Sequence, residues 1–340
     1  MTITTRGLGF ALGLAVAASQ ATAEDVTFRL SHWLPPQHPI AEQALKPWAD
    51  SITAASGGTI KFEVFPSAQL GAAADHYDMA RDGIADIAWL NPGFNAGRFP
   101  VFGAVQIPVT VANGHGGIRA MNDWYAKYAP QEMSDVKFCL AHMLSPNALH
   151  SVKQVTDPAD ISGMKIRPSS AMEATFFRDL GAATVPGGNP EAREMFSRGL
   201  IDGSSGVVGS QFVFGVMDVA NYHLIVPFTA SSFALVINKS KYDGLTDDQK
   251  KVIDDHCNTE AAVKFFDAPQ NFEDEGMTRL EALADHTVTI PSPEVMEKWV
   301  AAAEPVRKAW AEEVTAKGYD AQAIQTELRD ALRANNALIE

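Results

Sequence analysis

Short apolar strands alternate with helices through the first part of this sequence. Residues 26–30, 60–64 and 86–90 have the apolar content and alternation of strands, and the segments between them carry apolar side chains at helical spacing. Strands that recur about every 30 residues with a helix between them are the signature of βαβ units. Because helices cover both faces of such a sheet, the pattern predicts an α/β fold built on a mainly parallel sheet.

The segment 162–206 contains two further strand–helix units. Ser170 and Glu173 predict a capping box at the start of the first helix. Asn189-Pro190 predicts the start of the second helix, as an N-cap followed by proline. The carboxyl end of each strand is therefore expected to face a helix N-terminus.

Arg167 lies at the carboxyl end of the first of these strands. Open α/β sheets bind their ligands at this position. A guanidinium there can hold a carboxylate in a bidentate pair. A surface or structural arginine would explain the same residues, so the local sequence leaves both roles open.

The first 23 residues have the three parts of a secretory signal peptide. Arg6 supplies the basic start, residues 7–18 an apolar core, and Ala21-Thr22-Ala23 the cleavage motif. The apolar run is shorter than the roughly 20 residues that a bilayer span needs. The residue directly after the cleavage motif is not a cysteine, so a lipid anchor is not expected. We therefore expect a periplasmic protein cleaved after Ala23, with a mature chain long enough for two domains.

The charge of the chain excludes some partners. Its formal net charge is −14, and loss of Arg6 with the leader makes the mature chain one unit more negative. Nucleic-acid binding depends on clustered Lys and Arg, so no nucleic-acid partner is expected. No later segment is apolar enough to span a bilayer, and no direct membrane insertion is expected either.

Two cysteines, Cys139 and Cys257, lie far apart in the sequence. The first is in an apolar strand-like run and the second in a polar helical stretch. A periplasmic location permits a disulfide, but two cysteines in a chain of this size do not form a disulfide framework. We expect two separate thiols.

The second half of the chain adds more strands and then becomes helical. Thr246 and Gln249 predict a capping box that opens a long helix toward Ala284. There is no long linker, so two domains must be joined by strands that cross between them. The other expected strands are 137–143, 149–153, 219–226, 233–238 and 287–290, and the final helices are 292–316 and 321–338.

Motifs of known catalytic chemistry are absent from the sequence. There is no H-E-x-x-H, no Cys/His set at metal-ligand spacing, no Walker A motif and no G-x-G-x-x-G. The segment 203–206 lacks the glycine spacing of a nucleophile elbow. We therefore predict no catalytic residue, metal or cofactor, and a periplasmic α/β enzyme remains the less favoured alternative.

Several motifs follow one another along the mature chain in an order typical of one family. These are Ser31-His32 with His38-Pro39, Phe65-Pro66 with Gln69-Leu70-Gly71, Gly83-Ile84-Ala85-Asp86-Ile87, Gly163-Met164-Lys165-Ile166-Arg167, Gly199-Leu200-Ile201-Asp202-Gly203 and Val236-Ile237-Asn238-Lys239. With them the chain resembles the solute-binding proteins of TRAP (tripartite ATP-independent periplasmic) transporters, in the C4-dicarboxylate-binding DctP family.

This resemblance implies a two-lobed clamshell, each lobe a mainly parallel sheet flanked by helices, with crossing hinge strands and long C-terminal helices. It implies domain I at 24–148 plus 232–275 and domain II at 149–231 plus 276–340. It also implies a receptor without catalytic activity, which closes on a small organic acid and delivers it to membrane permease subunits for ion-gradient-driven uptake. The family's arginine, matched by Arg167, forms a salt bridge to the ligand carboxylate.

One departure from the family pattern concerns the ligand. Where many members carry a polar pair after I-D-G, this chain has Ser205 and Gly206. The departure favours a ligand smaller than, or shaped differently from, a C4-dicarboxylate. An amine or a zwitterion such as an amino acid is the alternative ligand class, and transfer to a sensor kinase or an ATP-driven importer is the alternative route.

The predicted ligand site gathers loops at the carboxyl ends of strands. Arg167 anchors the carboxylate, and Gln69 lies on the same rim. The expected hydrogen-bond donors are Asn91, Ser169 and Ser205, and the expected apolar walls are Trp33, Trp89, Phe212 and Phe233, each of which could instead be an ordinary core residue.

Overall fold

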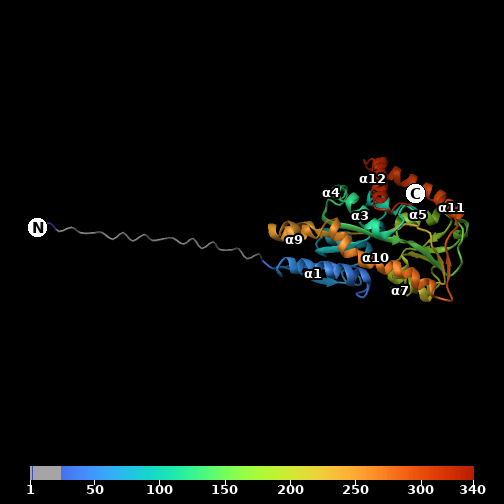
Figure 1. The fold of residues 1–340 in the computed structure, drawn as a ribbon, viewed down its shortest axis with the longest axis horizontal. Helices are drawn as coiled ribbons and strands as arrows, with labels where there is room; N and C mark the ends of the chain where they lie inside the picture. The colour runs from blue at the N-terminus through green and yellow to red at the C-terminus, as the bar shows by residue number, and fades with distance from the viewer. Residues whose placement is uncertain (1, 3–23) are drawn as a thin grey trace.

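The computed structural model describes residue 2 and residues 24–340 of the chain. The predicted signal peptide, residues 1–23, lies outside the described residues except for Thr2. Figure 1 shows an elongated molecule in which the helix α10 (Thr259–Glu281) runs lengthwise, from the end that carries α9 (Asp247–Asp255) toward α7 (Val208–Val213). Within the described part of the chain, no helix is both long enough and apolar enough to cross a membrane.

The first sheet has the strand order β2-β1-β3-β10-β4. Its strand β1 pairs in parallel with β2 and β3, while β10 pairs antiparallel with β3 and β4. We call this sheet and the helices around it the first lobe. The strands are β1 (Val26–Ser31), β2 (Ile60–Phe65), β3 (Ile87–Leu90), β4 (Val136–Pro146) and β10 (Ala230–Asn238).

The second sheet, in the second lobe, has the order β11-β9-β5-β8-β6-β7. Its strand β6 pairs in parallel with β7 and β8, and β5 pairs antiparallel with β8 and β9. The strands are β5 (Ala148–Ser151), β6 (Lys165–Arg167), β7 (Ala183–Thr184), β8 (Gly203–Gly206), β9 (Tyr222–Leu224) and β11 (Thr287–Thr289).

The predicted two-lobed α/β fold with crossing strands is confirmed, although both sheets are mixed rather than mainly parallel. The chain leaves the first sheet at Asn147, between β4 and β5, and returns between β9 and β10. These crossings run in opposite directions and are hydrogen-bonded to each other, Asn147 N to Thr229 O at 2.9 Å and Phe228 N to Asn147 O at 3.2 Å. The returning strand must therefore pair antiparallel in each lobe.

Helices cover both sheets. A π-helical segment, Ile40–Leu45, continues directly into α1, and short 3-10 helices include η3 (Pro92–Phe94), η4 (Phe102–Gln106) and η6 (Asn189–Glu191). The remaining α-helices are α1 (Lys46–Ala55), α2 (His76–Arg81), α3 (Gly114–Tyr125), α4 (Ala129–Glu132), α5 (Ala171–Asp179), α6 (Ala192–Ser197), α8 (Lys239–Asp243), α11 (Pro293–Ala316) and α12 (Ala321–Ala334).

The long helix predicted from Thr246 is two helices in the structure. Its capping box with Gln249 is present and opens α9, but the chain breaks at residues 256–258 before α10. Cys257 lies in this break and forms a disulfide with Cys139 on β4, with the Cα atoms 4.4 Å apart. The prediction of separate thiols was wrong, because the break brings together two residues that are 118 positions apart in the sequence.

The packing of the core joins the two lobes. One apolar cluster includes Phe28 and Trp89 of the first lobe together with Phe196 and Phe214 of the second. A cluster of this kind forms only when the lobes lie against each other. The structure therefore has the closed arrangement of the two lobes.

The last helices do not all follow the predicted division into domains. Leu328 and Leu332 of α12 pack in the same cluster as Met121 and Trp124 of α3, on the first lobe. The prediction grouped residues 276–340 with the second domain. The division into domains stays a prediction, with α12 as the point of difference.

Candidate ligand-binding site

Arg167 is a buried cation beside the cleft. It ends β6 and is 1% exposed. Its Nε donates to Ser204 Oγ at 3.0 Å, and its Nη2 donates to Asn189 Oδ1 at 2.7 Å and to Ser205 O at 2.6 Å. All three acceptors are neutral. Burial lowers the pKa of the Arg167 guanidinium to about 10, against the opposing effects of the Glu173 and Glu191 charges.

This guanidinium lacks a direct ion pair. Among the described residues, no carboxylate oxygen lies within 4.0 Å of it, and its Nη1 atom has no hydrogen-bond partner. Removing a cation from water costs several kcal/mol, which only a close anion and good hydrogen bonds can offset. The site can therefore accept an anion at Nη1.

Glu173 organises the polar groups around Arg167. It is fully buried, and its carboxylate accepts from Ser169 N at 2.5 Å, from Ser205 Oγ at 2.8 Å and from Thr229 Oγ1 at 3.0 Å. Ser170 accepts from the Glu173 N–H as predicted for the cap. The Glu173 side chain reaches Ser169 N rather than Ser170 N, so the predicted capping box is only half formed.

The same network reaches the crossing strands. Asn147 Nδ2 donates to Ser169 Oγ at 2.7 Å and to Thr229 Oγ1 at 3.1 Å. Both crossing segments between the lobes are thus bonded, through Thr229 and Ser169, to the carboxylate of Glu173. Arg167 and the crossings are parts of one buried hydrogen-bonded unit.

A small cavity of about 10 Å³ lies between the lobes beside this unit. Trp89 stacks on Phe233 with ring centroids 4.4 Å apart, and Trp33 lies 5.2 Å from Trp89. The Trp33 Nε1–H is buried and has no hydrogen-bond partner within residues 24–340. The cavity therefore combines aromatic walls with a free donor. Its lining from the first lobe is Trp33, Leu34, His38, Ile40, Trp89, Leu144 and Phe233, and from the second lobe Asn189, Val207, Ser210 and Phe214, with Ser231 at the crossing.

Three of the predicted wall residues, Trp33, Trp89 and Phe233, line this cavity. Phe212 does not. It lies on α7 facing α10, where the Arg279 guanidinium stacks over its ring at 3.9 Å. Gln69 also lies apart, with an exposed side chain in the loop after β2.

The predicted polar residues lie close to Arg167 but are already bonded to the protein. The hydroxyls of Ser169 and Ser205 belong to the network of Glu173. Asn91 Nδ2 donates across the cleft to Ser169 O at 3.5 Å, while its Oδ1 accepts from Gly93 N and Gln106 Nε2. The structure places them as supports of the site, and their direct contact with a ligand stays a prediction.

Residues of the site that were not predicted to take part in it include Asn189, Glu173, His38 and Phe214. Asn189 was interpreted as an N-cap, but the N-cap of η6 is Gly188 and the Asn189 side chain bonds to Arg167. The signal that could have found Phe214 is the aromatic pair two residues apart, of which only Phe212 was chosen.

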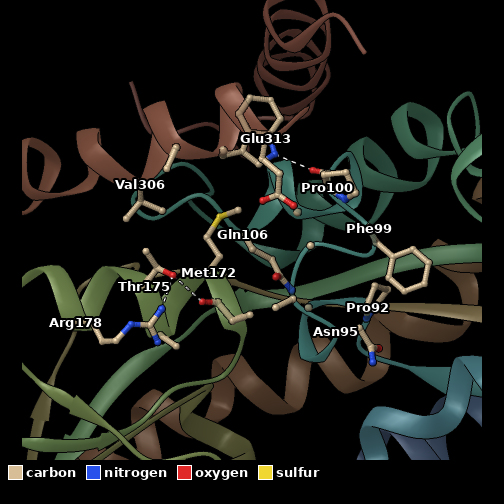
Figure 2. A pocket seen from close by; sticks show the side chains of 18 residues that line it. Pro92, Asn95, Phe99, Pro100, Gln106, Met172, Thr175, Arg178, Val306 and Glu313 are labelled. Carbon is tan, nitrogen blue, oxygen red and sulfur yellow. Dashed lines mark hydrogen bonds between the residues drawn. The ribbon is translucent and has the colours of Figure 1, made fainter. Parts of the chain in front are cut away.

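A second hollow lies between the lobes on another side of the molecule. Figure 2 shows it between the η3–η4 loop, α5 and α11, with Gln106, Met172 and Glu313 pointing toward it. Its volume is about 320 Å³. Its arginine, Arg178, is exposed and donates to Thr175 Oγ1 at 2.8 Å. This hollow has no buried cation in need of an anion, so it is the weaker candidate for a charged ligand.

Metal binding finds no support in the described residues. No group of three or more His, Cys, Asp or Glu side chains within residues 24–340 is placed to hold a metal ion.

Comparison with known proteins gives a family match and several similar relatives. The model of the family "Bacterial extracellular solute-binding protein, family 7" (DctP) matches residues 30–313. The protein TsaT of Comamonas testosteroni, described as an outer membrane transporter protein, is 24% identical over 321 residues, covering 91% of this chain and 92% of TsaT. The 2,3-diketo-L-gulonate-binding periplasmic protein YiaO of Escherichia coli is 25% identical, covering 60% of this chain and 63% of YiaO.

Two solved structures are similar over nearly the whole chain. A TRAP solute-binding protein from Rhodoferax ferrireducens T118, in complex with copurified benzoate, has a TM-score of 0.86 and 26% identity, covering 92% of this chain and 98% of its own. A marine metagenome TRAP solute-binding protein specific for aromatic acid ligands, in complex with 3-hydroxybenzoate, has a TM-score of 0.86 and 25% identity, covering 92% of this chain and 100% of its own.

Proposed function

Because this chain belongs to family 7 of the bacterial extracellular solute-binding proteins, we propose that it is the periplasmic receptor of a TRAP transporter and that its ligand is an aromatic carboxylate. The family and its structural neighbours are transport receptors rather than enzymes. In this role the protein captures its ligand between the lobes and delivers it to membrane permease subunits. The predicted leader at residues 1–23 supplies the route to the periplasm.

The observation that carries the proposal is the unpaired, buried guanidinium of Arg167. Its bonded partners are neutral, and its Nη1 atom is free of partners among the described residues. A carboxylate at this position forms a charge-assisted hydrogen bond and offsets the desolvation of the cation. Exclusion of water by the closed lobes strengthens that ion pair.

The aromatic class of ligand is supported by the walls of the cavity. Trp33, Trp89 and Phe214 offer ring faces and edges, and aromatic pairs add about 0.5–1.5 kcal/mol beyond the burial of their area. In the closed arrangement the cavity of about 10 Å³ has room for little more than one water molecule, so a ring enters it only when the lobes move apart. The two similar structures hold benzoate and 3-hydroxybenzoate respectively.

Lobe closure follows from the position of the cavity. Its lining comes from both lobes, so a ligand in it makes contacts with both at once. These contacts exist only when the lobes meet. The ligand therefore favours the closed arrangement by its differential affinity.

The test is isothermal titration calorimetry of the mature protein with four probes: benzoate, its neutral analogue benzamide, the non-aromatic cyclohexanecarboxylate and the zwitterion phenylalanine. We expect benzoate to bind, benzamide not to bind, and cyclohexanecarboxylate to bind more weakly. Arg167→Ala should cost about 2–5 kcal/mol of benzoate binding. The matched control is Arg178→Ala, which removes an exposed arginine of the same lobe.

Each probe isolates one part of the proposal. Equal affinity for benzoate and benzamide would contradict the proposal that the site binds an anion. Binding of phenylalanine alone would favour the zwitterion alternative. Benzoate affinity that survives Arg167→Ala would show that another group holds the carboxylate.

A further inference from the structure

His38 bridges the two lobes at the edge of the ligand cavity. It follows β1 in the first lobe, yet its ring is buried against α7 of the second lobe. Its Nε2 lies 3.1 Å from Ser210 Oγ, and its ring centroid lies 5.2 Å from that of Phe214. Its Nδ1 accepts from the Ile40 N–H at 3.3 Å, within its own lobe.

The direction of these hydrogen bonds is fixed. A backbone N–H can only donate, so Nδ1 of the neutral ring carries no proton and Nε2 is the donor. His38 Nε2–H therefore donates to Ser210 Oγ. The Ser210 hydroxyl keeps its own proton and donates it to the carboxylate of Glu273 on α10.

Glu273 fixes the position of Ser210 by accepting hydrogen bonds from both its hydroxyl and its backbone N–H. Its other carboxylate oxygen accepts from Ser210 N at 2.9 Å. The backbones of α7 and α10 approach closely here, because a Cβ built on Gly276 would lie 2.5 Å from the Cα of Gly209. Both glycines are thus required for the contact. Ser210 is fixed against α10 and presents a lone pair to His38.

We infer that His38 and Ser210 form a latch between the lobes, which Glu273 keeps in position and which stabilises the closed arrangement around the ligand cavity. Glu273 is a positioning residue, since it acts through Ser210. The part that the latch plays in ligand capture rests on the proposed function, whereas its effect on closure does not.

The chain contains a matched control for this latch. Ser31 Oγ and His76 Nε2 form another buried serine–histidine hydrogen bond, at 3.2 Å, with both residues in the first lobe. Loss of this pair weakens one lobe without changing a contact between lobes. The comparison of Ser210→Ala with Ser31→Ala therefore separates a latch from a purely structural role.

The experiment measures the distance between the lobes with spin labels at Ala54→Cys on α1 and Gln154→Cys after β5, both exposed. The native cysteines are joined to each other, so the labels react only at the new sites. Double electron–electron resonance gives the populations of short (closed) and long (open) distances without ligand and with benzoate as the probe.

We expect the closed-to-open ratio of the ligand-free protein to fall about 3- to 10-fold in Ser210→Ala, the range for one neutral hydrogen bond. His38→Phe keeps the ring against Phe214 but removes the donor, and should give a similar fall. The double variant should fall no further than either single variant, because both remove the same bond. Ser31→Ala should leave the ratio unchanged.

Three results would overturn the latch: an unchanged ratio in Ser210→Ala, an equal fall in Ser31→Ala, or additive effects in the double variant. A ligand-free parent that shows only the open distance would overturn it as well, since the bond would then not stabilise a closed state. Failure of the proposed function appears separately, as a parent distribution that benzoate does not change.

Discussion

Arg167 Nη2 and Asn189 Oδ1 are joined by a hydrogen bond of 2.7 Å. Because a guanidinium can only donate, the atom of Asn189 that faces it is the oxygen. The amide nitrogen of Asn189 is then left without a partner among the described residues, and Asn189 lines the ligand cavity. The charged donor of Arg167 therefore lies directly behind a neutral amide in the cavity wall.

This relationship predicts the effect of an internal counter-ion. Asn189→Asp places a carboxylate at the position that accepts from Arg167, so the protein supplies its own anion. We expect benzoate affinity in calorimetry to fall at least 10-fold while the melting temperature rises. Asn189→Ala should lower the affinity without raising the melting temperature. A variant Asn189→Asp that melts below the parent would show that Arg167 is not in need of an anion.

The network of Glu173 predicts a stability effect. The Glu173 carboxylate accepts from Ser169, Ser205 and Thr229, so an amide at this position turns a donor toward groups that themselves donate. We expect Glu173→Gln to lower the free energy of unfolding by about 1–3 kcal/mol, the cost of one unsatisfied buried group. Urea denaturation measures it. Glu281→Gln, at the exposed end of α10, is the control and should change little.

The disulfide predicts a larger loss. Cys139 and Cys257 close a loop of 118 residues, for which the chain-entropy model gives about 4–5 kcal/mol. We expect the double variant Cys139→Ala/Cys257→Ala to unfold at a correspondingly lower urea concentration. A reducing agent should lower the unfolding midpoint of the parent but leave that of the double variant unchanged. Two thiols titrated in the unreduced, unfolded parent would contradict the bond.

Glu273 predicts a pH dependence of stability. Burial raises the pKa of its carboxyl from 4.5 to about 7, despite hydrogen bonds from Ser210 and Gly209 that lower it, and the Asp274 charge raises it further. Between these two values the folded state binds more protons than the unfolded state, so this group makes stability fall as pH rises from about 4.5 to 7 and adds no slope above. The total is on the order of 3–4 kcal/mol.

The measurement for Glu273 is a comparison of melting temperatures of the parent and Glu273→Gln between pH 4 and 8. As pH rises across this window, the melting temperature of the variant should rise relative to that of the parent. His32 and His38 act in the opposite direction, because burial lowers the pKa of these rings to about 4 and about 3. Their effect is common to both proteins and cancels in the difference. A difference that does not vary with pH would contradict the raised pKa.

The strands, the lobes and the place of Arg167 could be predicted because each leaves a local pattern. Glu173 and Asn189 were assigned to helix capping, which explains their positions in the sequence. Their partners in the site, Arg167 for Asn189 and Ser205 and Thr229 for Glu173, lie 22 to 56 residues away. Phe212 and Phe214 are two residues apart near the end of α7, and only packing decides that the first faces α10 and the second the cavity.

Gln69 shows a further limit of prediction from sequence. The rule that loops at the carboxyl ends of strands gather on one rim led us to expect it at the site, but its side chain is exposed and does not line the cavity. The φ angles of Ser67 and Ala68 are positive, 53° and 58°. The loop turns so that these two residues, rather than Gln69, line a further hollow between the lobes, next to Trp33. Backbone turns of this kind in residues other than glycine carry no clear signal in the sequence.

The central claim is that Arg167 and Asn189 hold a carboxylate inside the aromatic cavity. A crystal structure of the mature protein with benzoate tests it most directly. We predict a carboxylate oxygen about 2.7–3.0 Å from Arg167 Nη1, with the ring between Trp89 and Phe214. Benzoate in the hollow of Figure 2, or in the cavity with its carboxylate directed away from Arg167, would contradict the account.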